Sequence, residues 1–261
     1  MKIIPKKSLG QNFLIDKKII DKIVNIEDIK NRVIIEVGPG TGNLTEKIIQ
    51  KKIKKIYVIE KDNNLSIELK KKFKNGINII NDDVLNIDEK KIDKEKIIVF
   101  GNLPYNISTE ILVNWIINLD KTYFWFDTLI LMFQKEVADR IIAKYNTSEY
   151  GRLSIISNWK LDIKKICDIG PESFVPKPKI DSSLLIFKPK KKFFILKDPK
   201  NLEKITRIFF NHRRKMLKRP FNQLFNGNNK ILKKLKIDLN MRPQNLDLNT
   251  YYKITQEFEN L

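Results

Sequence analysis

Short apolar runs alternate with segments of helical periodicity through the first half of the chain, and this alternation limits the fold more than any other feature. Ile and Leu recur at helical spacing over residues 44–52, 64–74 and 110–118. Strands that alternate with helices at this pitch form a parallel sheet covered on both faces. The expected strands span residues 32–37, 55–60, 77–80, 96–100 and 128–133. The sequence therefore predicts an α/β fold with a Rossmann-like, doubly wound sheet.

The second half of the chain changes character near residue 189. Two further strands are expected at residues 160–169 and 182–188, with a proline-rich segment between them. After Pro189 the pattern turns to short helices separated by Asn and Lys. We therefore expect a catalytic domain over residues 1–188 and a small helical domain over residues 189–261.

The positive charge of the chain indicates a polyanionic partner. The formal net charge is +20, and residues 188–219 alone hold 13 Lys or Arg against two acids. Lysine outnumbers arginine 43 to 8, so part of the excess reflects compositional bias on a solvated surface. The clustering favours nucleic acid as this partner. A membrane is not favoured, because the sequence shows no amphipathic anchor.

Composition also excludes several classes of protein. No apolar run approaches the roughly 18 to 20 residues that span a bilayer. The N-terminus lacks the apolar core of a signal peptide, so a cytoplasmic protein is expected. Cys167 is the single cysteine and His212 the single histidine, which rules out an intrachain disulfide and argues against a zinc centre. We expect no bound metal.

A glycine-rich turn follows the first expected strand and opens a helix. Gly38, Gly40 and Gly42 allow close approach of the backbone to a ligand at the helix N-terminus. Glu60 closes the second strand, where an acid can accept hydrogen bonds from ribose hydroxyls. Asp83 follows the third strand and could accept from an adenine amino group or cap a loop. These residues predict an adenosine-containing cofactor, without distinguishing NAD from S-adenosylmethionine.

An uncharged tetrapeptide, Asn-Leu-Pro-Tyr, follows the fourth strand at the same edge of the sheet. The Asn102 side-chain oxygen and nearby carbonyls can accept both N–H groups of an exocyclic amine. This localises the nitrogen lone pair and directs it toward an electrophilic methyl group, without a strong base. Pro104 stiffens the turn, and Tyr105 offers a face on which a base can stack. The tetrapeptide thus predicts methylation of a base amine.

Nine motifs along the chain occur in the order found in one enzyme family. They are GQNFL, EVGPGTGNLT, VIEKD, NDDVL, GNLPYNIST, FQKEVADRI, YGRLS, SFVPKPKIDSS and FFNHRRKML. Each motif alone is weak, whereas nine in this order are specific. Together they resemble the ribosomal RNA small-subunit adenine dimethyltransferases, the kasugamycin-resistance methylases. The resemblance runs from about Lys6 to the last helical segments.

The resemblance implies a role for each matching residue. The cofactor, S-adenosylmethionine, would be bound by Asn12, Leu14, Gly38, Gly40, Glu60, Asp83 and Asn102. The catalytic site would comprise Asn102, Leu103, Tyr105 and Phe174. In it, Leu103 would offer a backbone carbonyl, and Tyr105 and Phe174 would sandwich the flipped adenine. Without the resemblance, Phe174 fits a core position better.

The resemblance also implies a substrate. It is two adjacent adenines near the 3′ end of 16S small-subunit RNA, presented by a pre-30S particle late in assembly. The enzyme would be a cytoplasmic monomer with no membrane partner.

Three other functions compete with this one. The erythromycin-resistance methylases share the fold but carry Ile where this chain has Leu103, and they usually lack GQNFL and RRKML. Non-enzymatic relatives act as mitochondrial transcription factors, but the intact glycine turn, Glu60 and Asn102 favour catalysis. An NAD-linked oxidoreductase would leave Asn-Leu-Pro-Tyr and the basic stretch unexplained.

Overall fold

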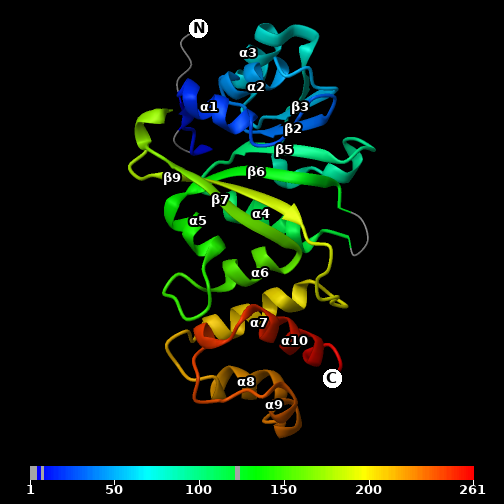
Figure 1. Cartoon of the computed structure of the whole chain (residues 1–261), viewed down its shortest axis with the longest axis vertical. Coiled ribbons are helices and arrows are strands. Elements are labelled where there is room, and N and C mark those ends of the chain that lie inside the picture. Colours follow the sequence, from blue (N-terminus) through cyan, green and yellow to red (C-terminus); the bar gives the residue numbers. More distant parts are fainter. Residues whose placement is uncertain (1–4, 7–8, 121–123) are drawn as a thin grey trace. The chain divides into compact units, whose positions relative to one another are not determined.

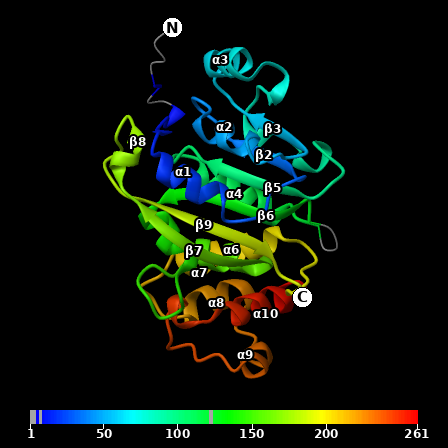
Figure 2. The ribbon, with the colours of Figure 1, turned by 45° about the horizontal axis from the view of Figure 1, so that its top comes forward.

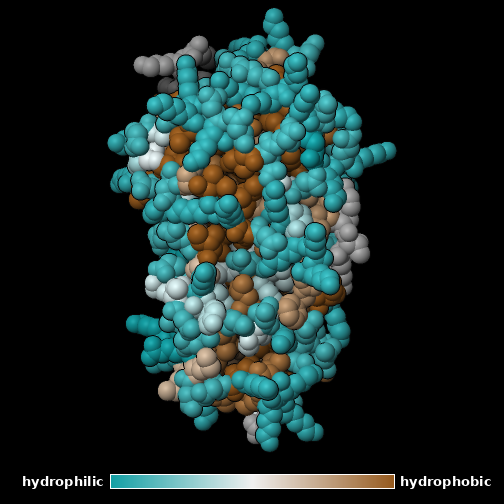
Figure 3. Space-filling view, in the orientation of Figure 1, coloured by the Kyte–Doolittle hydropathy of each residue, from teal (hydrophilic) through white to brown (hydrophobic). Residues whose placement is uncertain are grey.

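The computed structural model describes residues 5–6, 9–120 and 124–261, which divide into two compact units. The first unit comprises the described residues up to 111 together with 124–138 and 163–189. The second comprises residues 112–120, 139–162 and 190–261. Hydrophilic side chains cover most of the face seen in Figure 3, as a chain with 31% charged residues leads one to expect.

A seven-stranded sheet with the order β4-β3-β2-β5-β6-β9-β7 forms the centre of the first unit (Figures 1 and 2). The strands are β2 (Val33–Val37), β3 (Lys55–Ile59), β4 (Asn78–Ile80), β5 (Ile97–Asn102), β6 (Phe126–Gln134), β7 (Leu161–Ile169) and β9 (Ser182–Pro189). Strands β2 to β6 are parallel to their neighbours among these five. All five residues of β2 are buried, so both faces of the sheet are covered there. The predicted α/β fold is confirmed.

Strand β9 departs from the parallel pattern because it runs antiparallel to β6. The segment between β7 and β9 holds only a 3₁₀ turn and the two-residue strand β8 (Phe174–Val175). The antiparallel direction places the first residue of β9 at the edge where the parallel strands end.

Strand β8 pairs with another two-residue strand, β1 (Phe13–Leu14), in a separate antiparallel sheet. Phe13 lies opposite Val175, and Leu14 lies opposite Phe174. This pairing fixes the N-terminal segment beside the proline-rich segment.

Several helices begin at a residue whose side chain caps the first turn. Asp16 accepts hydrogen bonds from the first turn of α1, and Asp62 does the same for α3. The α-helices are α1 (Lys17–Val24), α2 (Asn43–Ile49), α3 (Asn63–Phe73), α4 (Ser108–Ile117), α5 (Lys135–Ile142), α6 (Arg152–Lys160), α7 (Lys200–Phe210), α8 (Lys218–Phe225), α9 (Asn229–Leu235) and α10 (Leu248–Phe258). Short 3₁₀ turns are η2 (Lys74–Gly76), η3 (Val84–Asn86), η4 (Glu89–Lys91), η5 (Pro171–Ser173) and η6 (Pro243–Asn245).

Helices α6, α7 and α10 pack together in the second unit. The buried Tyr252 hydroxyl donates to the Ile155 carbonyl oxygen at 2.9 Å. Phe209 of α7 meets Tyr251 of α10 edge to face, with ring centroids 5.5 Å apart. Residues 139–162 therefore belong with the C-terminal helices, although the sequence placed them in the domain of residues 1–188. The C-terminal part of this unit begins at residue 190, beside the expected boundary.

Candidate active site

A cavity of about 150 Å³ opens at the carboxyl ends of the parallel strands. Its walls are formed by Leu65 and by residues of five chain segments: 9–13, 37–40, 59–61, 82–84 and 102–107. This edge is where open α/β sheets bind their ligands. Eight residues expected at the site line this one cavity: Asn12, Gly38, Gly40, Glu60, Asp83, Asn102, Leu103 and Tyr105.

Two expected site residues, Leu14 and Phe174, are not among the residues that line this cavity. Leu14 lines a smaller neighbouring cavity, and its backbone oxygen accepts from Asn43 Nδ2 at 2.8 Å. Phe174 is only 2% exposed and lies in the hydrophobic core beside Leu14. Its burial favours a packing role in this conformation, and stacking of Phe174 on a base stays a prediction.

The glycine turn after β2 brings its backbone close to the end of β5, which neighbours β2 in the sheet. Gly38 has φ +69°, and a Cβ there would lie 3.0 Å from the Asn102 carbonyl oxygen. Gly40 has φ +57°, and a Cβ there would lie 2.7 Å from the Phe13 ring. A side chain at either position would strain the backbone and crowd the cavity.

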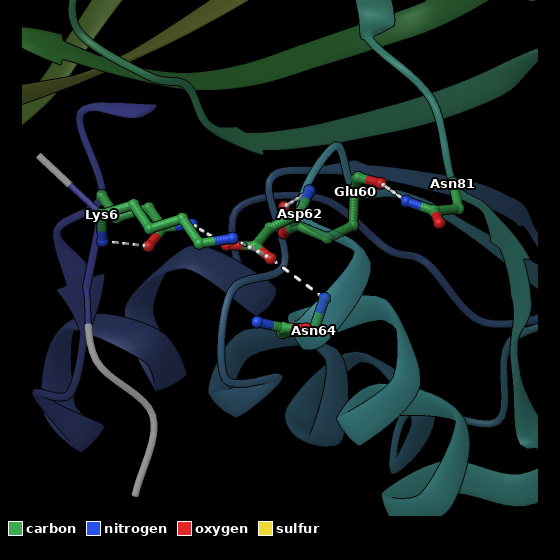
Figure 4. Close-up of polar contacts among 6 residues, drawn as sticks. Lys6, Glu60, Asp62, Asn64 and Asn81 are labelled. Atoms are coloured by element: carbon green, nitrogen blue, oxygen red, sulfur yellow. Dashed lines mark hydrogen bonds and ion pairs between the residues drawn. The ribbon is translucent and has the colours of Figure 1, made fainter. Parts of the chain in front are cut away.

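Glu60 is buried at the end of β3 and ties the glycine turn to the next helix. Its carboxylate accepts from the Asp62 backbone N at 2.9 Å and from the Gly40 backbone N at 3.3 Å. Asn81 Nδ2 donates to the Glu60 backbone oxygen at 2.7 Å (Figure 4). Burial raises the pKa of Glu60 above its ordinary value.

Asp62 fastens the N-terminal segment to the wall of the cavity. Its side chain is 3% exposed and accepts from Lys6 Nζ at 2.9 Å (Figure 4) and from Gln11 Nε2 at 3.0 Å. It also accepts from the Asn64 backbone N at 3.0 Å as the cap of α3. Burial opposes ionisation of Asp62, but the bonds from Lys6 and Gln11 hold its pKa below the ordinary value. Sequence reasoning missed this clamp; only the capping position of Asp62 could have suggested it.

Asn102 is held at the end of β5 by the same N-terminal segment. Its Nδ2 donates to the Asn12 carbonyl oxygen at 2.8 Å, so Oδ1 is the atom that can accept from a ligand. The next turn is closed by a bond from Ile107 N to the Pro104 oxygen at 3.1 Å. These two hydrogen bonds hold the loop that follows β5.

Asp83 caps a turn and also lies on the wall of the cavity. Its carboxylate accepts from Leu85 N at 3.1 Å as the cap of η3, and it also lines the cavity. Lys61 Nζ donates to its other oxygen at 2.7 Å. Burial works against the charge, but the bond from Lys61 lowers the pKa of Asp83. An ionised Asp83 can accept a hydrogen bond from an adenine amino group.

Glu36, in β2, is a buried carboxyl that sequence reasoning did not single out. It is 1% exposed, lines the smaller cavity, and its Oε2 has no hydrogen-bond partner among the described residues. Burial raises the pKa of Glu36 from 4.5 to about 7. The folded protein therefore retains a proton that the unfolded chain releases as pH rises above 4.5.

Glu36→Gln is expected to reduce the loss of stability that the ligand-free protein suffers between pH 5 and pH 8. In the wild type, the raised pKa stabilises the fold at low pH, and this contribution falls as pH rises to about 7. A shift of this size corresponds to a free energy of unfolding on the order of 3 kcal/mol. Thermal melts across this pH range measure it, with the exposed Glu110→Gln as control. Parallel pH profiles for wild type and Glu36→Gln would contradict the assignment.

A family model for ribosomal RNA adenine dimethylases matches residues 5–260 of the chain. The chain belongs to this family. It is 63% identical over 256 residues to ribosomal RNA small subunit methyltransferase A of Pelagibacter ubique, covering 98% of this chain and 97% of that protein. The identity to the protein of that name from Ehrlichia ruminantium is 42% over 253 residues, covering 95% and 94%.

Solved structures agree with the family. A crystal structure of a Plasmodium falciparum dimethyladenosine transferase superposes with a TM-score of 0.81 at 28% identity, covering 95% of this chain and 98% of that chain. The 23S rRNA methyltransferase ErmE gives a TM-score of 0.69 at 19% identity, covering 96% and 100%, which shows a shared fold. The protein is therefore a ribosomal RNA adenine dimethyltransferase, and family and fold imply S-adenosylmethionine as methyl donor.

Nowhere in residues 5–6, 9–120 and 124–261 do three or more His, Cys, Asp or Glu side chains gather as a metal site requires. None of the helices described there combines the length and apolar character of a membrane span.

Proposed function

We propose that the protein dimethylates the N6 atoms of two adjacent adenines near the 3′ end of 16S small-subunit RNA. It would act as a cytoplasmic monomer on a pre-30S particle late in assembly. The observation that carries the chemistry is that Glu60, Asn102 and Tyr105 line one cavity. The names of the two relatives support the choice of small-subunit RNA.

The cavity residues fit S-adenosylmethionine. The turn at Gly38 and Gly40 has no room for side chains, so its backbone can approach the methionine portion. The buried Glu60 carboxylate would accept from the ribose hydroxyls, and Asp83 would accept from the adenine of the cofactor. When bound, this cofactor would supply an electrophilic methyl group.

The loop after β5 would hold the target amine. Asn102 Oδ1 and the Leu103 carbonyl oxygen would accept its two N–H groups, which localises the nitrogen lone pair. No strong base is needed, because the amine can release its proton to water after attack. Tyr105 would stack on the base once it has left the RNA stack.

Primer extension tests the proposed substrate. Dimethylated N6 atoms cannot form Watson–Crick pairs, so reverse transcriptase should stop at two adjacent adenines near the 3′ end of small-subunit RNA. These stops should vanish in cells that lack the gene and return when purified protein is added to their small-subunit particles. Unchanged stops in the deletion strain would overturn the proposal.

The basic stretch of residues 188–219 remains our candidate for gripping RNA phosphates. In the structure, α7 ends at Phe210 and the Arg-Arg-Lys motif lies in the turn before α8. Arg213 donates to Gln244 Oε1 at 3.2 Å and also to the Ser148 carbonyl oxygen, so it holds the second unit together. Arg214 and Lys215 are exposed and have no ion pair among the described residues.

The Arg214→Ala/Lys215→Ala double variant is expected to bind small-subunit particles weakly and to flatten the salt dependence. Each lost phosphate contact removes about one unit from the log–log slope, so a decrease of about two is predicted. Arg213→Ala is the matched comparison, since it should lower the melting temperature more. Binding titrations at several salt concentrations measure this; an unchanged slope in the double variant would exclude Arg214 and Lys215 from RNA contact.

Part of this basic stretch, together with Arg152 of α6, surrounds a hollow within the second unit. The hollow, of about 320 Å³, is lined by Arg152, Lys200, Asn201, Glu203, Lys204 and Arg207. The three α7 cations are spaced to lie on one helix face. Arg152 belongs to the YGRLS motif, and we include this hollow in the proposed RNA-binding surface.

A further inference from the structure

The Tyr105 hydroxyl contacts a residue of a strand that lies far away in the sequence. The hydroxyl lies 2.5 Å from Ser182 Oγ. Ser182 is fully buried at 0% exposure and is the first residue of β9. Burial raises the pKa of the Tyr105 hydroxyl above its ordinary value, so the group stays protonated at neutral pH.

The sheet register explains why these two residues meet. Along β6, Met132 lies opposite Asn102 on one side and Leu184 on the other. Gln134, two residues further along β6, lies opposite Ser182. Because β9 is antiparallel, Ser182 lies just beyond the level of Asn102, where the chain leaving β5 reaches Tyr105.

We propose that Ser182 is a positioning residue, which holds the Tyr105 ring in the orientation that receives the target adenine. This inference rests on the proposed function. The backbone of Tyr105 is already fixed, since its carbonyl oxygen accepts from Ser108 Oγ at 3.3 Å. The remaining freedom is rotation of the side chain, and the bond to Ser182 removes it before RNA arrives. Otherwise, base binding would have to order the ring.

The chain provides a matched control in the next residue. Successive strand residues point to opposite faces, so Ser183 faces away from Tyr105. Its hydroxyl donates to Asp168 Oδ1 at 2.6 Å, and Asp168 also accepts from Lys135 at 2.6 Å. Ser183→Ala removes a buried hydroxyl of β9 without altering the partner of Tyr105.

A double-mutant cycle between Ser182→Ala and Tyr105→Phe tests the proposal. Loss of one neutral hydrogen bond predicts a decrease of about 2- to 12-fold in kcat/KM for small-subunit particles at saturating S-adenosylmethionine. Each single variant and the double variant should show the same decrease, because they lose the same bond. Cofactor affinity should not change, and Ser182→Thr should restore activity. Additive losses, or equal losses in Ser182→Ala and Ser183→Ala, would overturn the proposal.

A second readout separates this inference from the proposed substrate. In NMR spectra of protein with isotope-labelled tyrosine, Ser182→Ala should make the Tyr105 ring more mobile without any RNA present. Ser183→Ala should leave the Tyr105 signals as in the wild type. A rigid ring in Ser182→Ala would refute the positioning role, whereas failure of the wild type to methylate small-subunit particles would refute only the proposed function.

Discussion

Replacement of Asn102 by alanine is expected to lower the single-turnover rate of methyl transfer by about 10²- to 10³-fold. The amide is fixed by its bond to the Asn12 carbonyl oxygen, so Oδ1 is already oriented for the amine when RNA arrives. Such preorganised groups act mainly where charge develops during the reaction. Binding of small-subunit particles should change little, because the amide makes one contact of many.

Rapid-quench measurements with saturating enzyme and S-adenosylmethionine isolate this step. The exposed Asn114→Ala variant serves as control for loss of an asparagine amide. A near-normal single-turnover rate in Asn102→Ala would show that backbone carbonyls alone hold the amine.

Glu60→Ala is expected to weaken S-adenosylmethionine binding by one to two decades, while the fold is retained. Losing hydrogen bonds to a charged acceptor costs about 1.5 to 3 kcal/mol, which corresponds to roughly 10- to 150-fold in affinity. The same substitution frees the Gly40 and Asp62 amides, which now donate to this carboxylate. Calorimetry with S-adenosylmethionine measures the loss, and the partly exposed Glu68→Ala serves as control. Unchanged affinity with a native-like melting temperature would remove Glu60 from the site.

The sheet and most of the cavity could be predicted because buried parallel strands are continuous apolar runs. The expected strands at residues 32–37 and 96–100 correspond to β2 and β5 within two residues. Glu60 and Asn102 follow such runs, and the carboxyl ends of parallel strands meet at one edge. Placing these two residues on one cavity therefore needed only strand positions.

Very short strands, and contacts between residues far apart in the sequence, could not be predicted in the same way. Strands β1 and β8 have two residues each, which is too few to show a period. They pair although one lies near residue 13 and the other near residue 174 of the chain. The direction of β9 depends on a connection whose shape the sequence does not reveal. The contact between Ser182 and Tyr105 depends on this direction and could not be predicted either.

Only the tertiary structure shows which of two side chains of the same type is buried in contacts and which is exposed. Arg213 and Arg214 are equivalent as counted charges, but carbonyl and amide oxygens surround the first and leave the second exposed. Phe174 is expected against the adenine, and the structure shows it paired with Leu14 and buried in the core. Its aromatic character alone fits both positions.

Nucleoside mass spectrometry tests the central claim most directly. Purified protein would be incubated with S-adenosylmethionine and with ribosomal particles from cells that lack the gene, and each RNA would then be digested separately. We expect N6,N6-dimethyladenosine to approach two per small-subunit RNA and to be absent from large-subunit RNA. Adenosine that carries a single methyl group as the end product, or dimethyladenosine in large-subunit RNA alone, would contradict this account.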